Sequence, residues 1–325
     1  MLRDMTMDEF AIIAEIFAPL AEHAGAFGLK DDAAVIAPRS GFDLVVTTDQ
    51  VAEGTDFFKH DPADSIAKKA LLVNLSDLAA KGAGPKYYML NLALPQGMTR
   101  EWLERFAAGL REIQNTYALS LLGGDTSATD GPLAIAITAF GFVPHGKMVL
   151  RSGAKPGDAV YVTGQIGDSG AGLAIFRREK HTLTEAHRDY LISRYRVPQP
   201  PVEFGVALMG RASASVDVSD GLIADLGHVA AASHVKLEIE AAAIPRSEAL
   251  RAWWGDGIES IIRAATAGDD YQIAFTADPA QEQDIMARAG AIAVTRIGTV
   301  TAGQGVDLRH RGQSVAVPSP GYRHF

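Results

Sequence analysis

Hydrophobic and polar positions follow two different periods along the chain, which predicts helices interleaved with strands. Thr6 and Glu9 have the spacing of a capping box ahead of a first amphipathic helix. Helical apolar spacing predicts further helices over 65–80, 100–117, 170–178, 185–194, 222–232 and 281–289. Short apolar runs predict strands over 33–37, 43–48, 88–94, 119–122, 133–143, 159–163, 214–218, 236–239, 272–276 and 291–300. Such alternation is typical of the α/β or α+β class.

A polar segment rich in turn residues, 144–158, interrupts this pattern near the middle of the chain. Segments of this composition commonly connect domains. We therefore expect an N-terminal domain over residues 1–145 and a C-terminal domain over residues 146–325. The 325 residues are 47% hydrophobic and 21% charged, which is enough apolar material for two separate cores.

The charge and the cysteine content exclude several classes of function. Thirty basic and 39 acidic residues leave a net charge of −9, which disfavours nucleic acid or an anionic membrane as a partner. The chain has no cysteine, so it forms no disulfide and no cysteine metal site. It shows neither a signal peptide nor an apolar stretch of the roughly 18 residues that span a membrane. We expect a cytoplasmic protein.

The candidate chemistry lies in aspartates that follow predicted strands: Asp49, Asp125, Asp217 and Asp220. A single aspartate beside glycine is usually a turn residue or a helix cap. Several strands of one sheet, however, bring their ends to a common edge, where gathered carboxylates repel one another unless cations intervene. Ligand sets made of oxygen alone suit Mg²⁺, which usually bridges carboxylates to substrate phosphates. The residues alone therefore predict a Mg²⁺-dependent enzyme that acts on phosphates.

Neighbouring residues agree with this hypothesis. Asp77 interrupts an otherwise apolar helix, and Thr47, Thr48 and Ser219 add oxygen atoms beside the acids. The glycine pair at 123–124 would let a ligand approach the backbone closely. The segment 219–221 leads into a predicted helix, whose N-terminus favours phosphate.

Eight blocks with matching order and spacing resemble the thiamine-monophosphate kinase family, within the aminoimidazole-ribonucleotide-synthetase-like (AIR-synthetase-like) superfamily. They are KDDAAV (30–35), TTDQVAEGTDF (47–57), KALLVNLSDLAAKGAGP (69–85), LLGGDT (121–126), RSGAKPGD (151–158), VTGQIGDSGAGL (162–173), VDVSDGLIADLGH (216–228) and AGDDYQIAF (267–275). The resemblance implies an α/β (α+β) two-domain AIR-synthetase-like fold. Its N-terminal domain would form a dimer sheet or barrel with its twin in a homodimer, and its C-terminal domain would also be α/β.

The reaction implied by this resemblance transfers the γ-phosphoryl group of ATP to thiamine phosphate, giving thiamine diphosphate and ADP. The attacking phosphate oxygen is already anionic at neutral pH, so no general base is required. The reaction needs neutralisation of two anions and in-line alignment, which several Mg²⁺ ions would supply. Whether K⁺ assists stays open.

The family pattern assigns roles by position. It implies metal ligation by Asp32, Thr47, Thr48, Asp49, Asp77, Asp125, Asp217 and Asp220. It implies ATP contacts by Tyr117, Gly124, Asp125, Arg151 and Ser219. The positions that face thiamine phosphate are Asp56, Asp269 and Tyr322, and those at the reacting groups are Asp125, Arg151 and Asp220. A guanidinium such as that of Arg151 can grip phosphate oxygens in a bidentate manner.

Four residues depart from the family pattern: Lys30, Asp56, Lys81 and Asp269. Since two of them lie on the acceptor side, we expect an intact metal site with a retuned acceptor pocket. Lys81 has the i,i+4 spacing to pair with Asp77. The alternatives are another AIR-synthetase-like ATP-dependent enzyme and a catalytically silent nucleotide-binding homologue. The block NLSDLAAKGAGP and the aromatic residue near the C-terminus favour the kinase.

Overall fold

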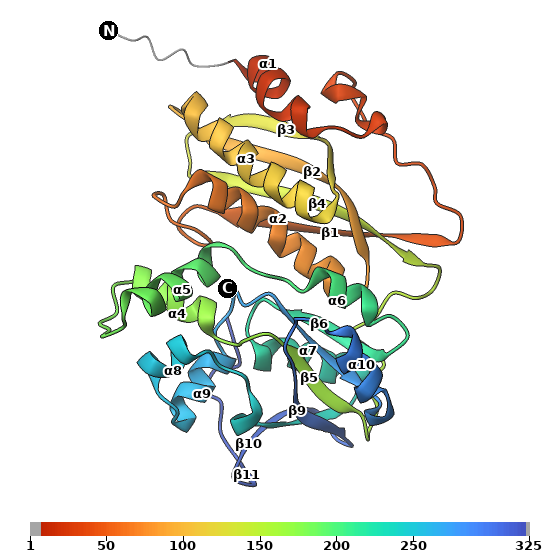
Figure 1. Cartoon of the computed structure of the whole chain (residues 1–325), viewed down its shortest axis with the longest axis vertical. Helices are drawn as coiled ribbons and strands as arrows, with labels where there is room; N and C mark the ends of the chain where they lie inside the picture. Colours follow the sequence, from red (N-terminus) through yellow and green to blue (C-terminus); the bar gives the residue numbers. More distant parts are fainter. Residues whose placement is uncertain (1–7, 323–325) are drawn as a thin grey trace. The chain divides into compact units, whose positions relative to one another are not determined.

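The computed structural model describes residues 8–322 and divides into two compact units. The first unit holds residues up to Leu78 together with Gly84–Gly146, and the second holds Ala79–Ala83 and the chain from Lys147 onward. Each unit contains one mixed sheet with helices (Figure 1), so the expected α/β class with two domains is confirmed. Among the helices of residues 8–322, none has the length and hydropathy needed to cross a bilayer.

The first unit is built on a four-stranded sheet in the order β1-β4-β2-β3. Its strands are β1 (Phe42–Ala52), β2 (Gly84–Pro95), β3 (Ser120–Thr129) and β4 (Ala134–Pro144). The pairs β1–β4 and β4–β2 are antiparallel, whereas β2 and β3 run parallel. Helices α2 (Ala63–Ala80) and α3 (Arg100–Tyr117) lie along this sheet (Figure 1). The Thr99 hydroxyl caps α3 by accepting the Trp102 N–H.

The segment before β1 differs from the prediction. The predicted first helix is present as a continuous helical segment, but its hydrogen-bond spacing changes along it: α1 (Glu9–Ala11) runs directly into a π-helical turn (Ile12–Phe17) and a 3₁₀ turn (Ala18–Leu20). A separate 3₁₀ turn covers Ala24–Leu29. The N-cap is Asp8, whose carboxylate accepts the Ala11 N–H at 2.8 Å, while Thr6 lies outside the described residues. The expected strand at 33–37 is wrong, because the Val35 N–H bonds to the Gly25 carbonyl within a loop and not to a neighbouring strand.

The second unit is built on a seven-stranded sheet in the order β11-β10-β7-β9-β5-β8-β6. The strands are β5 (Ala159–Thr163), β6 (Ala212–Val218), β7 (Lys236–Glu240), β8 (Gln272–Ala277), β9 (Val294–Thr301), β10 (Gly305–His310) and β11 (Gln313–Ser314). All neighbours are antiparallel except β7 and β10. Buried side chains of β5, β6, β7 and β8 pack with those of α7 (Leu222–Ser233) into the main core of this unit.

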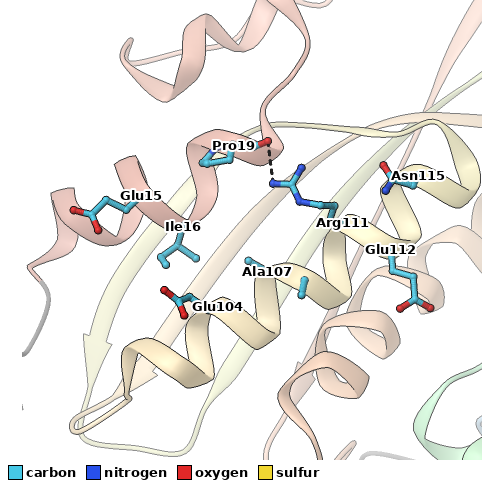
Figure 2. A pocket seen from close by; sticks show the side chains of 9 residues that line it. Glu15, Ile16, Pro19, Glu104, Ala107, Arg111, Glu112 and Asn115 are labelled. Atoms are coloured by element: carbon cyan, nitrogen blue, oxygen red, sulfur yellow. Dashed lines mark hydrogen bonds between the residues drawn. The ribbon is translucent and has the colours of Figure 1, made fainter.

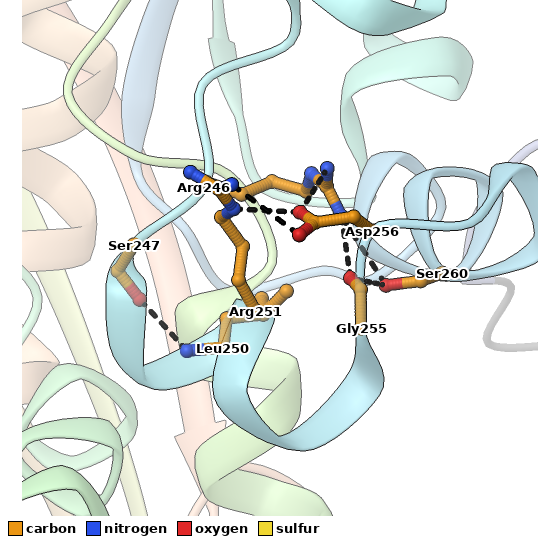
Figure 3. A network of polar contacts seen from close by, with 7 residues as sticks. All are labelled: Arg246, Ser247, Leu250, Arg251, Gly255, Asp256 and Ser260. Atoms are coloured by element: carbon orange, nitrogen blue, oxygen red, sulfur yellow. Dashed lines mark hydrogen bonds and ion pairs between the residues drawn. The ribbon is translucent and has the colours of Figure 1, made fainter.

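Six further helices complete the second unit. They are α4 (Asp168–Phe176), α5 (Glu185–Arg196), α6 (Val202–Ala207), α8 (Glu248–Trp254), α9 (Ile258–Ala265) and α10 (Glu282–Arg288). The turn between α8 and α9 is fixed by a polar network (Figure 3). There Asp256 accepts from Arg246 at 3.3 Å and from Arg251 at 2.6 Å, and Arg246 also donates to the Gly255 carbonyl. This network fixes the backbone of the Gly-Asp-Gly turn at 255–257.

Two strands extend further than their apolar runs predict. β1 continues to Ala52 and β3 to Thr129, because both remain paired with neighbouring strands over these residues. Asp49 and Asp125 therefore lie inside strands and not at strand ends, which corrects the prediction. In a strand, successive side chains point to opposite faces of the sheet. Which predicted residues can form one site therefore depends on which of them share a face.

Candidate functional site

A group of carboxylates in the first unit gathers between β1 and α2. The pleat of β1 turns Thr47 and Asp49 inward, with the buried Val45 and Val51 on the same face. The Thr47 hydroxyl donates to Oδ2 of Asp77 at 2.5 Å. One turn away on α2, Asn74 accepts the Asp49 backbone N–H at 3.1 Å. The polar residues that interrupt the apolar pattern of α2 thus contact β1.

The electrostatics of this group fit a hard cation. Burial, together with the nearby charges of Asp77 and Asp56, raises the pKa of Asp49 to about 6. Three carboxylates with hydroxyl and amide oxygens beside them form a donor set made of oxygen alone, as Mg²⁺ prefers. Asp49, Asp77 and Thr47 would hold such an ion. A bound cation would offset the repulsion that the fold imposes on these carboxylates.

Asp56 is held by a tight turn that follows β1. Its Oδ2 accepts the Ala52 N–H at 2.8 Å, and its carbonyl accepts from Nζ of Lys69 at 2.8 Å. Lys69 lies on α2 and its side chain is only 1% exposed. Lysine is almost never this buried without partners, so we infer that it fixes the turn and balances part of the acidic charge. The sequence analysis missed Lys69, although a lysine directly before the apolar run 70–73 could have indicated it.

Two predicted ligands in the first unit point to the opposite face of the sheet. Thr48 is exposed, and its hydroxyl donates to the Ile137 carbonyl at 3.1 Å. Asp125 lies on β3, opposite Asn91 of β2, and is exposed. β3 forms the other edge of the sheet from β1. Three strand spacings, roughly 14 Å, separate those edges. The structure therefore does not bring the side chains of Thr48 and Asp125 to Asp49 within one chain.

Three other predicted residues of the first unit lie in a loop, at the end of a helix and in β3. Asp32 is exposed in the loop before β1, where its N–H donates to Asp31 at 2.8 Å, and Lys30 is exposed beside it. Tyr117 is half-buried at the C-terminal end of α3. A Cβ at Gly124 would lie 1.7 Å from the Leu90 carbonyl oxygen, so the approach of β2 alone already requires glycine there.

A second acidic group lies in the second unit, where β6 ends and α7 begins. Asp217 is buried on β6, and Ser219 and Asp220 form the loop that follows. In residues 8–322, Asp220, Asp225 and His228 are the one group of three potential metal-ligating side chains whose ligand atoms lie within 4.8 Å of one another. The pKa of Asp225 is raised to about 7, because burial and the charge of Asp220 outweigh the backbone N–H groups that lower it.

The N–H groups of this loop are already occupied. Oδ2 of Asp225 accepts the backbone N–H groups of Ser219, Asp220 and Gly221, each at 3.1 Å. The sequence predicted that this segment offers a phosphate site, but these three donors serve a carboxylate of the protein itself. Asp225 was missed because the sequence does not show that its side chain reaches back from the first turn of α7.

Two residues predicted to face thiamine phosphate meet the same loop. The Asp269 N–H donates to the Ser219 carbonyl at 2.8 Å, and the Tyr322 N–H donates to the Asp220 carbonyl at 2.9 Å. Asp269 and Tyr271 have φ values of 68° and 50°, which are uncommon for residues with a side chain. Tyr322 is 48% exposed. The structure thus joins predicted acceptor residues to predicted metal and ATP residues through the backbone.

Two cations of the second unit differ in their surroundings. The Arg151 residue is exposed, and its carbonyl accepts from the Ser233 hydroxyl at 3.3 Å. Nζ of Lys81 donates to the Ser215 carbonyl at 2.7 Å, so a pair with Asp77 stays a prediction. The exposed guanidinium of Arg151 has the chemistry to bind a phosphate.

A hollow of about 470 Å³ lies elsewhere in the first unit, between the N-terminal turns and α3 (Figure 2). Arg111 on its floor donates to the Pro19 carbonyl at 3.2 Å. The lining mixes acids, alanines and one arginine: Glu15, Ile16, Pro19, Glu104, Ala107, Ala108, Arg111, Glu112 and Asn115. It includes none of the predicted site residues, so the candidate chemistry does not belong to this hollow.

Comparison with known proteins identifies the family. Residues 30–143 match the AIR synthase related protein, N-terminal domain, and residues 155–311 match the AIR synthase related protein, C-terminal domain. The thiamine-monophosphate kinase of Escherichia coli (strain K12) is 39% identical over 327 residues, which cover 99% of this chain and 99% of that protein. The chain belongs to the thiamine-monophosphate kinase family. The resemblance found in the sequence is confirmed.

Solved structures of this kinase family share the fold. The crystal structure of thiamine-monophosphate kinase from Stenotrophomonas maltophilia K279a matches with a TM-score of 0.81 and 38% identity, covering 88% of this chain and 91% of that one. A structure of AaThiL complexed with AMPPCP and TMP matches with a TM-score of 0.78 and 32% identity, covering 93% of this chain and 97% of that one.

Proposed function

We propose that this chain phosphorylates thiamine phosphate to thiamine diphosphate by direct, in-line transfer of the γ-phosphoryl group of ATP. The observation that carries this proposal is the match over 93% of the chain to the kinase solved with AMPPCP and TMP. The identity of 39% to the Escherichia coli kinase over almost the whole length supports it. The acidic groups of both units supply the chemistry that such a transfer requires.

The chain's own residues organise the reactants. The acceptor oxygen is anionic, so catalysis consists of neutralising charge and aligning the two phosphates. Mg²⁺, when bound, supplies this neutralisation, and Asp49, Asp77 and Thr47 would hold it in the first unit. The Thr47 hydroxyl fixes Oδ2 of Asp77, which leaves that carboxylate oriented before any ion arrives. In the second unit, Asp217 and Asp220 offer two more carboxylates.

The remaining family positions keep their predicted roles in this proposal. Exposed Arg151 would grip phosphate oxygens of ATP. Tyr117, Gly124 and Ser219 would make other contacts to ATP. The exposed ring of Tyr322 would stack on the acceptor, and Asp56 and Asp269 would face its other groups. One carboxylate oxygen of Asp56 already accepts the Ala52 N–H. This agrees with an acceptor pocket whose contacts differ from those of the family pattern. We place the enzyme in the cytoplasm.

We also propose a homodimer formed through the outer face of the four-stranded sheet. On that face Leu44 and Val46 of β1 are 44% and 52% exposed, and Phe140 and Phe142 of β4 are only half-buried. An apolar strip on an edge strand and its neighbour is a usual interaction surface. Asp125 and Thr48 share this outer face, whereas Asp49 lies on the inner face beside α2.

Release of ADP with different acceptors tests the activity. We expect Mg²⁺-dependent ADP release with thiamine phosphate and none with the substrate of aminoimidazole ribonucleotide synthetase. The reverse preference would assign the chain to another branch of the superfamily. Absence of turnover with either acceptor, despite ATP binding, would make the protein a silent nucleotide-binding homologue. Asp220→Asn is the matched variant, and it should abolish turnover in the kinase.

A further inference from the structure

The backbone of the loop between β6 and α7 is held by a single buried carboxylate. Asp225 is 2% exposed, and one of its oxygens accepts three successive backbone N–H groups, from Ser219 to Gly221. Successive N–H groups that converge in this way form a concave anion site. In this chain the anion is a side chain of the following helix, so the loop is shaped without any ligand.

The outer side of the same loop carries two other segments. Its carbonyls at Ser219 and Asp220 accept the N–H groups of Asp269 and Tyr322 at 2.8 and 2.9 Å. Just before the loop, the Val218 carbonyl accepts the Tyr271 N–H at 2.7 Å. A change in the loop backbone would therefore move residues on the acceptor side as well as Asp220.

Packing around the loop leaves little room for adjustment. A Cβ at Gly268 would lie 2.6 Å from the Ser219 carbonyl oxygen, and one at Gly321 would lie 2.4 Å from the Asp220 carbonyl oxygen. Gly221 has a φ of 124°, and a Cβ there would meet the Thr266 backbone at 3.0 Å. Both neighbouring segments thus approach the loop so closely that only glycine fits, and the loop position sets theirs.

We propose that Asp225 is a positioning residue for both substrates. Its carboxylate fixes the Ser219–Gly221 backbone, and this backbone in turn places Asp220 toward Mg·ATP and Asp269 and Tyr322 toward thiamine phosphate. The proposal rests on the proposed function for the names of the two substrates. The hydrogen bonds that link the segments do not depend on it.

The test compares Asp225→Asn and Asp225→Ala with the matched control Asp158→Asn. Asp158 is also buried in the second unit, where it accepts the Lys155 N–H at 3.1 Å and the Ser213 hydroxyl at 2.5 Å. It lies at the opposite end of β6 from the loop, since Ala212 at the start of β6 pairs with Ala277, which also pairs with Ala159 next to Asp158, whereas Val218 pairs with Gln272. Steady-state kinetics, thermal unfolding and amide hydrogen exchange of peptides covering 216–222 are measured for each variant.

For Asp225→Asn we expect KM for both ATP and thiamine phosphate to rise by about 10–100-fold, as is typical for residues that orient metal ligands. Amide exchange at 219–221 should accelerate by about tenfold or more, because three charge-assisted hydrogen bonds weaken. Asp225→Ala should show larger changes in the same direction. Asp158→Asn should lower the Tm by a similar amount with both KM values unchanged.

An unchanged KM for either substrate in Asp225→Asn would overturn the proposal, and so would equal kinetic losses in Asp158→Asn. If Asp225→Ala does not fold, the isosteric asparagine variant decides. A wild-type protein that releases no ADP would refute the proposed function. Unaltered amide exchange in Asp225→Asn would instead show that the Asp225 carboxylate does not hold the 219–221 backbone, whatever reaction the protein performs.

Discussion

Asp49 is the residue at which burial and chemistry oppose each other most clearly. Its pKa of about 6 in the folded chain exceeds the ordinary value of 3.8, so between these pH values the folded state binds a proton that the unfolded state has released. The free energy of unfolding therefore falls as pH rises through this window, by up to about 3 kcal/mol from this group. The cost at neutral pH is what a bound cation would remove.

Urea unfolding in EDTA from pH 4 to pH 7.5 checks this sign. Asp49→Asn removes the buried charge, so its stability should depend less on pH and should exceed that of the wild type above pH 6. Identical pH profiles for the two proteins would mean that Asp49 is not strained by its neighbours.

Mg²⁺ should reverse the balance, because a metal binds the deprotonated carboxylates. We expect Mg²⁺ to raise the Tm of the wild type more at pH 7.5 than at pH 5.5, and to have little effect on Asp49→Asn. The control is Asp43→Asn, on the same strand, where the carboxylate instead accepts from His145 and from the Gly146 N–H. Asp43→Asn should keep the full response to Mg²⁺, and an equal loss in both variants would argue against a site at Asp49.

At this scale the sequence could identify residue types but not their directions. Asp49 was singled out because it follows a predicted strand and Asp77 because it interrupts an apolar helix, and the structure places both in one group. Thr48 and Asp125 were predicted as partners, yet a strand reverses its side chains at every residue and the register was unknown. The sequence analysis did not identify Asp225 and Lys69, because their roles depend on backbone groups that only the fold brings near them.

The elements themselves were predictable where the pattern was long and its ends were marked. The bounds of α3 and β5 agree with the prediction, since α3 begins after a capping threonine and ends at Ala118 in the left-handed conformation. The first predicted helix is helical from Glu9 to Leu20, but its α-helical hydrogen bonding gives way to π and 3₁₀ turns, which the apolar spacing does not show. Short elements such as α6, β10 and β11 carry too few residues to show a period.

Glycines in helices test how closely the elements pack. A Cβ at Gly172 in α4 would lie 2.3 Å from the Leu191 carbonyl oxygen of α5, whereas one at Gly227 in α7 would meet nothing within 4 Å. We expect Gly172→Ala to destabilise the protein by about 1–3 kcal/mol, because two backbones must separate. Gly227→Ala should stabilise it by about 0.5–1 kcal/mol. Chemical denaturation measures both, and equal effects would contradict the packing of α4 against α5.

At the scale of the whole molecule, composition and the alternation of elements predicted the class but not the sheets. The order of seven strands in the second unit joins residues far apart in the chain, and β9 lies between β5 and β7. The local hydrophobic period does not predict which distant strands pair. The family resemblance does imply a fold, because eight sequence blocks match the family in order and spacing.

The proposed dimer belongs to this scale. Val46→Asp places a charge in the apolar strip of β1 and should convert a dimer into a monomer in sedimentation velocity. Val35→Asp is the matched control, since Val35 is 55% exposed in a loop and should leave the dimer intact. Two variants with the same mass as the wild type would show that the association, if any, uses another surface.

The most direct measurement follows the γ-phosphate itself. ATP labelled with ³²P at the γ position is incubated with thiamine phosphate, with and without Mg²⁺, using the wild type and Asp49→Asn. The account predicts labelled thiamine diphosphate only when Mg²⁺ is present. It also predicts a rate at least about 100-fold lower in Asp49→Asn, as expected when a metal ligand at the transferring group is lost. Label that appears in inorganic phosphate only, or equal transfer by Asp49→Asn, would contradict it.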